Sequence, residues 1–265
     1  LSKNFFLWPM GIDIDNKNRI FLTGHRSNNV LLVRNGKVDK SLTPFGVSLG
    51  YPFDIAFDKR FDFVYVSDYK NNIIYKLNFN GKILKKIGID FKDNQKLNGP
   101  AGICTDLAGN IYVVDQGNNR IVKINSNGEF VFSFGKIGKE LSEFYKPVDI
   151  VYIPEKKELI VSNSYNNRID IFDQWGNYID SIESQDIIEP RGLFYSDNNY
   201  LYIVTKDKIL AYDFVTESIQ PISLGSAELF EPYFCLLDKN NNLVITEPYK
   251  QRVDFFIPQD ELYLN

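Results

Sequence analysis

The sequence predicts an all-β fold, a six-bladed β-propeller whose blades are four-stranded antiparallel sheets. A proline followed by an apolar run recurs six times along the 265 residues, at intervals of 42 to 48 residues. Repeats of this length that hold four short strands are typical of β-propellers. The six repeats fill residues 1–265 as a single domain, and they begin near Pro9, Pro52, Pro100, Pro147, Pro190 and Pro232.

Each repeat contains apolar runs separated by turn residues. In the third repeat the runs are PAGICT, NIYVVD, RIVKI and FVFSF, and the other repeats follow the same order. β-Branched and aromatic residues favour strands, and the Asn-Gly and Asn-Asn steps between the runs favour hairpins. No apolar run has the length and period of an amphipathic helix. We therefore expect four consecutive antiparallel strands in every repeat.

The fourth run of the last repeat decides how the ring closes. Phe130 follows Arg120 by ten residues in the third repeat, and Leu262 follows Arg252 by the same interval. The segment ELYLN at 261–265 is therefore expected to supply the outer strand of the sixth blade. Residues 1–8 then fall on the connection between blades, and we predict no exchange of strands between the termini.

The third repeat, GPAGICTDLAGNIYVVDQGNNRIVKINSNGEFVFSFG, resembles an NHL repeat. It has the Pro-x-Gly start, the Asp-x-x-Gly-Asn turn, the Asp-x-x-Asn-Asn-Arg hairpin and a closing glycine. The fourth repeat keeps this pattern in VSNSYNNRIDIFDQWGNYI, and the remaining repeats depart from it more. The resemblance spans the chain and implies a six-bladed NHL-repeat propeller. It leaves the function open, because one propeller frame carries many unrelated sites.

Composition and charge narrow the classes of partner. The chain is 44% hydrophobic and 24% charged, as in ordinary globular domains, and its net charge is −4. In the loops expected at the functional face, six cations are offset by six acids, which disfavours nucleic acid as a partner. No apolar run reaches the ~20 residues of a membrane helix, so we expect no membrane insertion within this segment. Cys104 and Cys235 lie in apolar runs and are expected to be buried free thiols.

The location of the protein is a separate expectation. The chain begins at Leu1 rather than at Met, and it resembles NHL-type propellers. Together these two features favour an extracytoplasmic location, as a secreted protein or an ectodomain. A cytoplasmic location is the alternative.

The hairpin VVDQGNNRIVKI at residues 113–124 has two interpretations, a metal-binding loop and a structural turn. Its acids lack the EF-hand spacing, and the same slot holds SDYKNNI, SNSYNNR and TEPYKQR in other repeats. We interpret it as a turn in which Asn and Gly adopt positive φ. Asp115 and Arg120 are expected to bridge the turn and to bind loop carbonyls, as are Asn163 with Arg168 and Glu247 with Arg252. Anion capture by the three arginines is the alternative.

The residue after each repeat proline is expected to ring the mouth of the central channel. Most of these residues are apolar or aromatic, and Tyr69, Tyr165 and Tyr249 are expected nearby in hairpin loops. Aromatic groups with a single arginine are typical of protein-binding hot spots, although such a rim could also pack only on itself. The predicted binding residues are Met10, Phe53, Tyr165, Arg191, Tyr233 and Tyr249.

Four acids near the same mouth form a candidate metal site. Asp54 and Asp149 replace the glycine that follows in other repeats, and Glu189 and Glu231 precede repeat prolines. Carboxylate oxygens are the ligands that calcium and magnesium prefer. We expect no cofactor, with a calcium or magnesium ion at these acids as the alternative.

The sequence favours a non-catalytic binding or scaffold function on the loop-bearing side of the propeller. The partner would be a protein or peptide, or else a small molecule. Among the enzymes that this propeller resembles, amidating lyases bind zinc through several histidines, and streptogramin-type lyases use histidine with magnesium and an acid. His25 is the only histidine of this chain, so it cannot form a multi-histidine site. The alternative function is a metal-assisted lyase or a lactonase-like hydrolase that uses the acids at the channel mouth.

Overall fold

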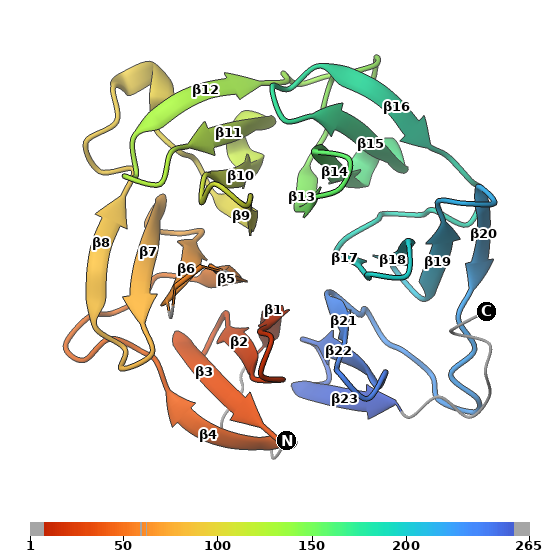
Figure 1. Ribbon diagram of the computed structural model, residues 1–265, viewed down its shortest axis with the longest axis horizontal. Coiled ribbons are helices and arrows are strands. Elements are labelled where there is room, and N and C mark those ends of the chain that lie inside the picture. The colour runs from red at the N-terminus through yellow and green to blue at the C-terminus, as the bar shows by residue number, and fades with distance from the viewer. Residues whose placement is uncertain (1–7, 59, 62, 257–265) are drawn as a thin grey trace.

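The computed structural model describes residues 8–58, 60–61 and 63–256. The strands of these residues form six antiparallel sheets around a central axis, as Figure 1 shows. Five sheets have four strands each, and the sixth has three within the described part of the chain. The predicted all-β, six-bladed propeller is confirmed.

Blades 1 to 3 each begin at a repeat proline. Blade 1 comprises β1 (Pro9–Ile14), β2 (Ile20–Gly24), β3 (Asn29–Arg34) and β4 (Lys37–Ser41). Blade 2 comprises β5 (Pro52–Phe57), β6 (Phe63–Asp68), β7 (Ile73–Asn78) and β8 (Ile83–Ile87). Blade 3 comprises β9 (Pro100–Thr105), β10 (Ile111–Asp115), β11 (Arg120–Ile124) and β12 (Phe130–Phe134).

Blades 4 to 6 complete the ring. Blade 4 comprises β13 (Pro147–Ile153), β14 (Glu158–Asn163), β15 (Arg168–Asp173) and β16 (Tyr178–Ile182). Blade 5 comprises β17 (Leu193–Tyr195), β18 (Tyr200–Val204), β19 (Ile209–Asp213) and β20 (Ser218–Pro221). Blade 6 comprises β21 (Cys235–Leu237), β22 (Leu243–Glu247) and β23 (Arg252–Phe256).

The first strands of blades 5 and 6 start later than those of the other blades, three residues after their prolines. The preceding residues are still paired with the second strand. Arg191 donates its backbone N–H to the Val204 carbonyl at 2.7 Å, and Tyr233 donates to the Thr246 carbonyl at 2.9 Å. The chain there keeps its hydrogen bonds without regular strand geometry.

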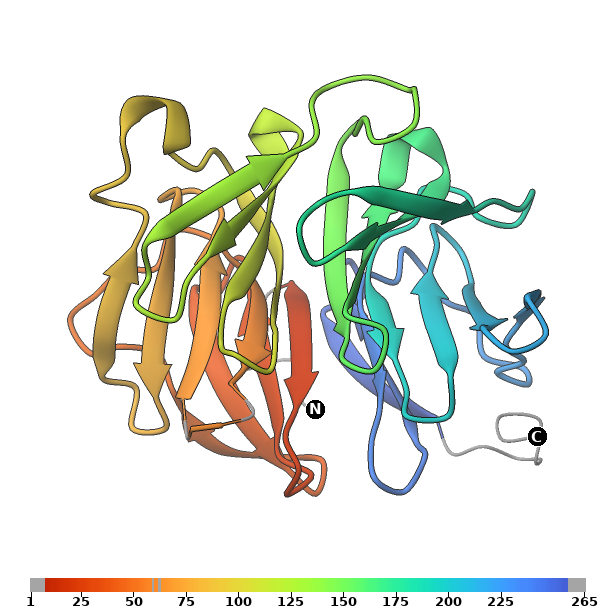
Figure 2. The ribbon, with the colours of Figure 1, turned by 45° about the horizontal axis from the view of Figure 1, so that its top comes forward.

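The position of each strand in its blade explains its composition. First strands face the channel and fourth strands lie at the rim, and Figure 2 shows the hairpins reaching both faces of the ring. All five residues of β10 are buried, because each inner sheet is covered by a neighbouring blade on both sides. Four of the five residues of β4 are exposed. Second strands are therefore continuous apolar runs, whereas fourth strands tolerate polar residues and are weaker in the sequence.

Neighbouring first strands approach closely at the second residue after each repeat proline. A Cβ added at Gly102 would lie 2.5 Å from the Cα of Asp149, and one at Gly11 would lie 2.4 Å from the Cα of Asp54. No side chain fits at these separations, so glycine and a larger residue alternate from blade to blade. In blade order this position holds Gly11, Asp54, Gly102, Asp149, Gly192 and Phe234.

Three aspartates of the first strands also tie neighbouring blades together. In each case a carboxylate Oδ2 accepts a backbone N–H from the first strand of the next blade. The bonds join Asp13 to Phe57 (2.6 Å), Asp54 to Ile103 (3.0 Å) and Asp149 to Leu193 (2.7 Å). Each bond satisfies a buried donor and fixes the register of one blade against the next.

The hairpin at residues 113–124 is a structural turn, as predicted. Asn119 has a φ of +49°. The Asp115 carboxylate accepts hydrogen bonds from Arg120 Nε at 2.7 Å and from the Asn98 backbone N–H at 2.6 Å. The Arg120 guanidinium also donates to the carbonyls of Asn94 and Lys96, both at 3.0 Å.

The corresponding pairs in blades 4 and 6 differ from one another. In blade 6, Arg252 donates to the Glu247 carboxylate at 2.8 Å, as predicted. In blade 4 the predicted pairing of Arg168 with Asn163 is wrong. The Arg168 Nε donates to Asp170 at 2.7 Å, because a full carboxylate two residues away is a stronger acceptor than the Asn163 amide.

Several remaining expectations concern the termini, the cysteines and the membrane. The predicted outer strand at 261–265 and the predicted course of residues 1–7 lie outside the described residues. Cys104 and Cys235 are free thiols, as expected, but only Cys235 is buried and Cys104 is partly exposed. Within the described ranges, no helix is long and apolar enough to cross a membrane.

We expect Gly102→Ala to lower the free energy of unfolding by about 3 kcal/mol, because the new methyl group would meet the Asp149 backbone. Gly46→Ala is the control. A Cβ at Gly46 meets nothing within 4 Å, and its φ of +71° alone should cost about 1 kcal/mol. Urea unfolding of both variants measures the difference, and equal losses would contradict a steric origin.

Candidate functional site

An aromatic hollow lies over the mouth of the central channel. It opens on the loop-bearing face, which carries the loops into the first strands and the hairpins between second and third strands. Its volume is about 270 Å³, and its walls come from blades 6, 1, 2 and 3. The aromatic hollow is lined by Trp8, Met10, His25, Phe53, Tyr69, Gln116, Tyr233, Pro248 and Tyr249.

The rings of the aromatic hollow pack against one another to form a continuous wall. The ring centres of Trp8 and Tyr249 are 4.6 Å apart. Phe53 stacks on Tyr69 and meets Tyr233 edge-on, each at 5.7 Å between ring centres. Phe53 is only 5% exposed, whereas Tyr249 is 54% exposed. The hollow therefore has a buried apolar floor and a solvent-exposed aromatic edge.

An unusual backbone conformation shapes the mouth of the channel. The residue before the repeat proline has a positive φ in blades 1, 3, 4, 5 and 6. Blade 3 places Gly99 there, whereas blade 1 places Trp8 at a φ of +63° and blade 6 places Glu231 at +50°. Left-handed backbone is strained for residues other than glycine, and such strain is often retained at binding sites.

His25 forms part of the wall and is neutral at pH 7. Its ring stacks on Tyr51 with 4.7 Å between centres and meets Phe53 edge-on at 6.1 Å. Burial, and then the neighbouring charge of Arg26, lower the pKa of His25 to about 4. Its Nδ1 atom is buried and has no hydrogen-bond partner within the described residues.

Three cations stand close to aromatic rings at this face. The Arg26 guanidinium lies 3.7 Å from the centre of the Trp8 ring, and the Arg191 guanidinium lies 5.3 Å from that of Tyr233. Lys70 Nζ lies 5.1 Å from the Tyr51 ring. Such distances allow cation–π attraction, which holds the cations at the edge of the hollow.

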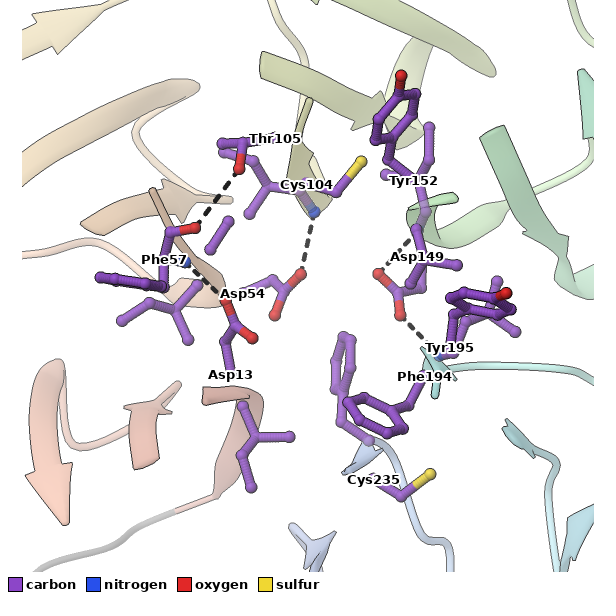
Figure 3. A pocket seen from close by; sticks show the side chains of 18 of the residues that line it. Asp13, Asp54, Phe57, Cys104, Thr105, Asp149, Tyr152, Phe194, Tyr195 and Cys235 are labelled. Carbon is purple, nitrogen blue, oxygen red and sulfur yellow. Dashed lines mark hydrogen bonds between the residues drawn. The ribbon is translucent and has the colours of Figure 1, made fainter. Parts of the chain in front are cut away.

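A second pocket of about 200 Å³ opens from the channel toward the opposite face. Figure 3 shows Asp13, Asp54 and Asp149 around it, with Cys104 and Cys235 nearby. Burial raises the pKa of Asp149 to about 7, and burial together with the charge of Asp149 raises the pKa of Asp54. Burial likewise raises the thiol pKa values of both cysteines, so these thiols are poor nucleophiles.

The four acids of the predicted metal site fall into two separate groups. Asp54 and Asp149 line the pocket on the opposite side and hold backbone N–H groups. Glu189 and Glu231 lie at the loop-bearing face beside Arg191. The part of the chain that the structure describes contains no cluster of three or more His, Cys, Asp or Glu side chains suited to a metal ion.

Comparison with a family model agrees with the repeat analysis. A model described as "NHL repeat" matches residues 97–124, which include β10 and β11 of blade 3. This match and the six-bladed ring together support an NHL-repeat propeller.

Solved structures share the fold of this NHL-repeat propeller. A streptogramin B lyase is similar with a TM-score of 0.71 and 18% identity, covering 98% of this chain and 86% of the other. A nidogen/laminin complex is similar with a TM-score of 0.64 and 16% identity, covering 92% and 82%. Identities this low show the fold alone. No curated protein sequence matches the chain.

The NHL-repeat propeller brings together most, but not all, of the predicted binding residues. Met10, Phe53, Tyr233 and Tyr249 line the aromatic hollow. Tyr165 is not among its lining residues and packs edge-on against Tyr145 at 5.3 Å. Arg191 also stands outside the lining. Its guanidinium contacts the Glu231 carboxylate and donates to the Pro232 carbonyl at 3.0 Å.

Some lining residues were missed by sequence reasoning. The sequence predicts Trp8 on the connection between blades and no binding role for His25, but both residues line the aromatic hollow. Alignment of the repeats offered a signal, because Trp8 stands immediately before a repeat proline, where blade 3 has Gly99. This slot holds an aromatic residue only in blades 1 and 2, which both contribute to the hollow.

We expect the stability of the NHL-repeat propeller to fall as the pH rises from about 4 to about 7. Asp149 has a pKa near 4 in the unfolded chain and about 7 in the fold. The folded state therefore binds more protons within this window, and raising the pH removes that stabilisation. Asp149→Asn keeps an acceptor for the Leu193 N–H but cannot ionise, so its thermal midpoint should fall by several degrees less between pH 5 and pH 8.

The exposed Asp180 provides the matched control. Asp180→Asn should leave the pH dependence of the wild type unchanged, because Asp180 lies on the outer strand β16. Thermal midpoints of all three proteins across the pH range give the comparison. Parallel curves for the wild type and Asp149→Asn would show that Asp149 does not titrate in this window.

Proposed function

We propose that this NHL-repeat propeller is a non-catalytic binding module that holds a protein or peptide partner at the aromatic hollow. The observation that carries the proposal is the convergence of six aromatic rings, that of His25 included, from blades 6, 1 and 2 on one open hollow. An apolar aromatic centre with a polar edge is the composition of interaction hot spots. A small molecule is the alternative occupant of the same site.

Exposed aromatic side chains on the loop-bearing face support a partner larger than a small molecule. Five of them lie in loops of the loop-bearing face, and each is at least 37% exposed. Apolar surface gathered on one face favours an interaction with another macromolecule. These residues are Tyr51, Tyr145, Tyr165, Phe230 and Tyr249.

The state of the polar groups favours binding over catalysis. His25 is neutral and in contact with aromatic rings. Asp54 and Asp149 are occupied by backbone N–H groups of the next blade, and Arg191 is held by Glu231. A lyase or hydrolase needs an acid or base within reach of a bound substrate. No two of these groups face the aromatic hollow together as an acid–base pair.

We expect calcium and magnesium to leave the thermal midpoint of the protein unchanged, because the four candidate acids lie in two groups. Differential scanning fluorimetry with either chloride salt, against sodium chloride of equal ionic strength, measures this. A rise of several degrees with one divalent ion would favour the metal-assisted enzyme. Loss of that rise in Asp54→Asn or in Glu231→Gln would locate the ion at one group of acids or the other.

We expect Tyr249→Ala to weaken binding of peptides selected on the wild-type protein from a random displayed library by about tenfold or more. Tyr249 is exposed, so its truncation should leave the fold intact. Trp175→Ala is the matched control, because Trp175 is 64% exposed in the hairpin between β15 and β16, on the opposite face. Fluorescence anisotropy measures the affinities. Selected peptides that bind Tyr249→Ala and Trp8→Ala as tightly as the wild type would contradict the proposed site.

A further inference from the structure

We infer that the partner segment is an acidic peptide that inserts one apolar side chain into the aromatic hollow. This inference rests on the proposed function and specifies the chemistry of its partner. It follows from three features: the cations already on the rings, the distribution of ion pairs at the rim and the volume of the hollow.

The rings of the aromatic hollow already carry cations of the chain itself. Arg26 covers Trp8 at 3.7 Å, and Arg191 stands over Tyr233 at 5.3 Å. Aromatic cages that bind ammonium groups offer free ring faces to the ligand. Here Arg26 already covers Trp8, so a cationic ligand would meet a like charge, and the hollow disfavours a lysine side chain or a quaternary ammonium group.

The acids of the rim are neutralised by cations of the chain. Glu231 contacts Arg191, and Glu189 lies 3.6 Å from Lys206. Glu247 is buried and pairs with both Lys250, at 3.0 Å, and Arg252. These three carboxylates therefore present little free negative charge to a partner.

Two exposed cations beside the hollow, Arg26 and Lys70, form no ion pair within the described residues. Asp68, the nearby acid, is fully buried, and its oxygens accept backbone N–H bonds from Gly50 at 2.7 Å and Tyr51 at 3.0 Å. The rim of blades 1 and 2 is therefore locally positive although the whole chain has a net charge of −4. Such a rim attracts a negatively charged segment.

The hollow has room for an apolar side chain. Its volume of about 270 Å³ lies near the lower limit of the usual range of ~300–1,000 Å³ for sites that enclose whole drug-sized molecules. His25 adds a neutral ring nitrogen, Nδ1, without a partner among the described residues. A peptide N–H next to the inserted side chain can supply the missing donor. An apolar anchor flanked by acids meets all of these features.

The test uses three acetylated and amidated heptapeptides with the intact 265-residue chain. The first has a central phenylalanine flanked by glutamates, the second replaces the glutamates with lysines, and the third replaces the phenylalanine with alanine. Isothermal titration at 50 mM salt should give binding of the first peptide at least tenfold tighter than of the other two. Raising the salt to 500 mM should weaken binding of the glutamate peptide, because salt screens the exposed charges of the rim.

Charge variants test the origin of the preference. Lys70→Gln and Arg26→Gln should each weaken binding of the glutamate peptide about three- to tenfold and reduce its salt dependence. Lys17→Gln is the control, because Lys17 is exposed in the hairpin between β1 and β2 on the opposite face. The double change of Arg26 and Lys70 to glutamate should reverse the preference in favour of the lysine peptide.

The outcomes separate this inference from the proposed function. Equal or tighter binding of the lysine peptide by the wild type, or failure of the glutamate peptide to bind, would overturn the acidic partner. An unchanged affinity of the glutamate peptide for both Lys70→Gln and Arg26→Gln would also overturn the acidic partner. In each case, library-selected peptides that still depend on Tyr249 would leave the binding function standing, whereas independence from Tyr249 would remove both.

Discussion

Close packing between the first strands of neighbouring blades is the constraint on which the ring depends. At the second residue after the repeat proline, the backbones come so close that a Cβ on Gly102 would lie 2.5 Å from the next blade. Only one residue of each facing pair can then carry a side chain. Glycine in blades 1, 3 and 5 meets aspartate or phenylalanine in blades 2, 4 and 6. Glycine and a larger residue therefore alternate three times around the ring of six repeats.

This constraint determines what the acids of the channel can do. Asp54 and Asp149 occupy the space that glycine leaves. One carboxylate oxygen of each accepts a hydrogen bond from a backbone N–H of the following blade. Their burial raises their pKa values instead of leaving two free anions for a cation. Above them, Phe53, Tyr233 and Phe234 pack together, with ring centres 5.6 to 6.2 Å apart. These rings lie between the aromatic hollow and the opposite pocket, so the hollow has a floor.

Local chemistry explains why the fold could be predicted and the full site could not. Hairpin turns depend on adjacent residues, so the proline spacing and the Asn-rich turns were sufficient to predict six blades. Gly102 and Asp149 are 47 positions apart in the sequence, and they face each other only in the assembled ring of blades. The same holds for Arg191, a predicted binding residue whose charge is met by Glu231, 40 residues away. Phe53 and Tyr233 could be predicted because they follow repeat prolines, and Tyr249 because its hairpin loop was expected near the mouth.

The three blades that build most of the hollow all depart from the regular repeat. Blade 3, the most regular, has Gly99 and Ala101 on either side of its proline, and it contributes only Gln116 to the lining. Blade 1 has Trp8 and Met10 in the same two slots. Six identical blades would surround the channel with a symmetric mouth, which offers no single place or orientation to a partner. Large residues in blades 6, 1 and 2 move the hollow to one side of the axis, and the regular blades 3 and 4 maintain the frame that supports it.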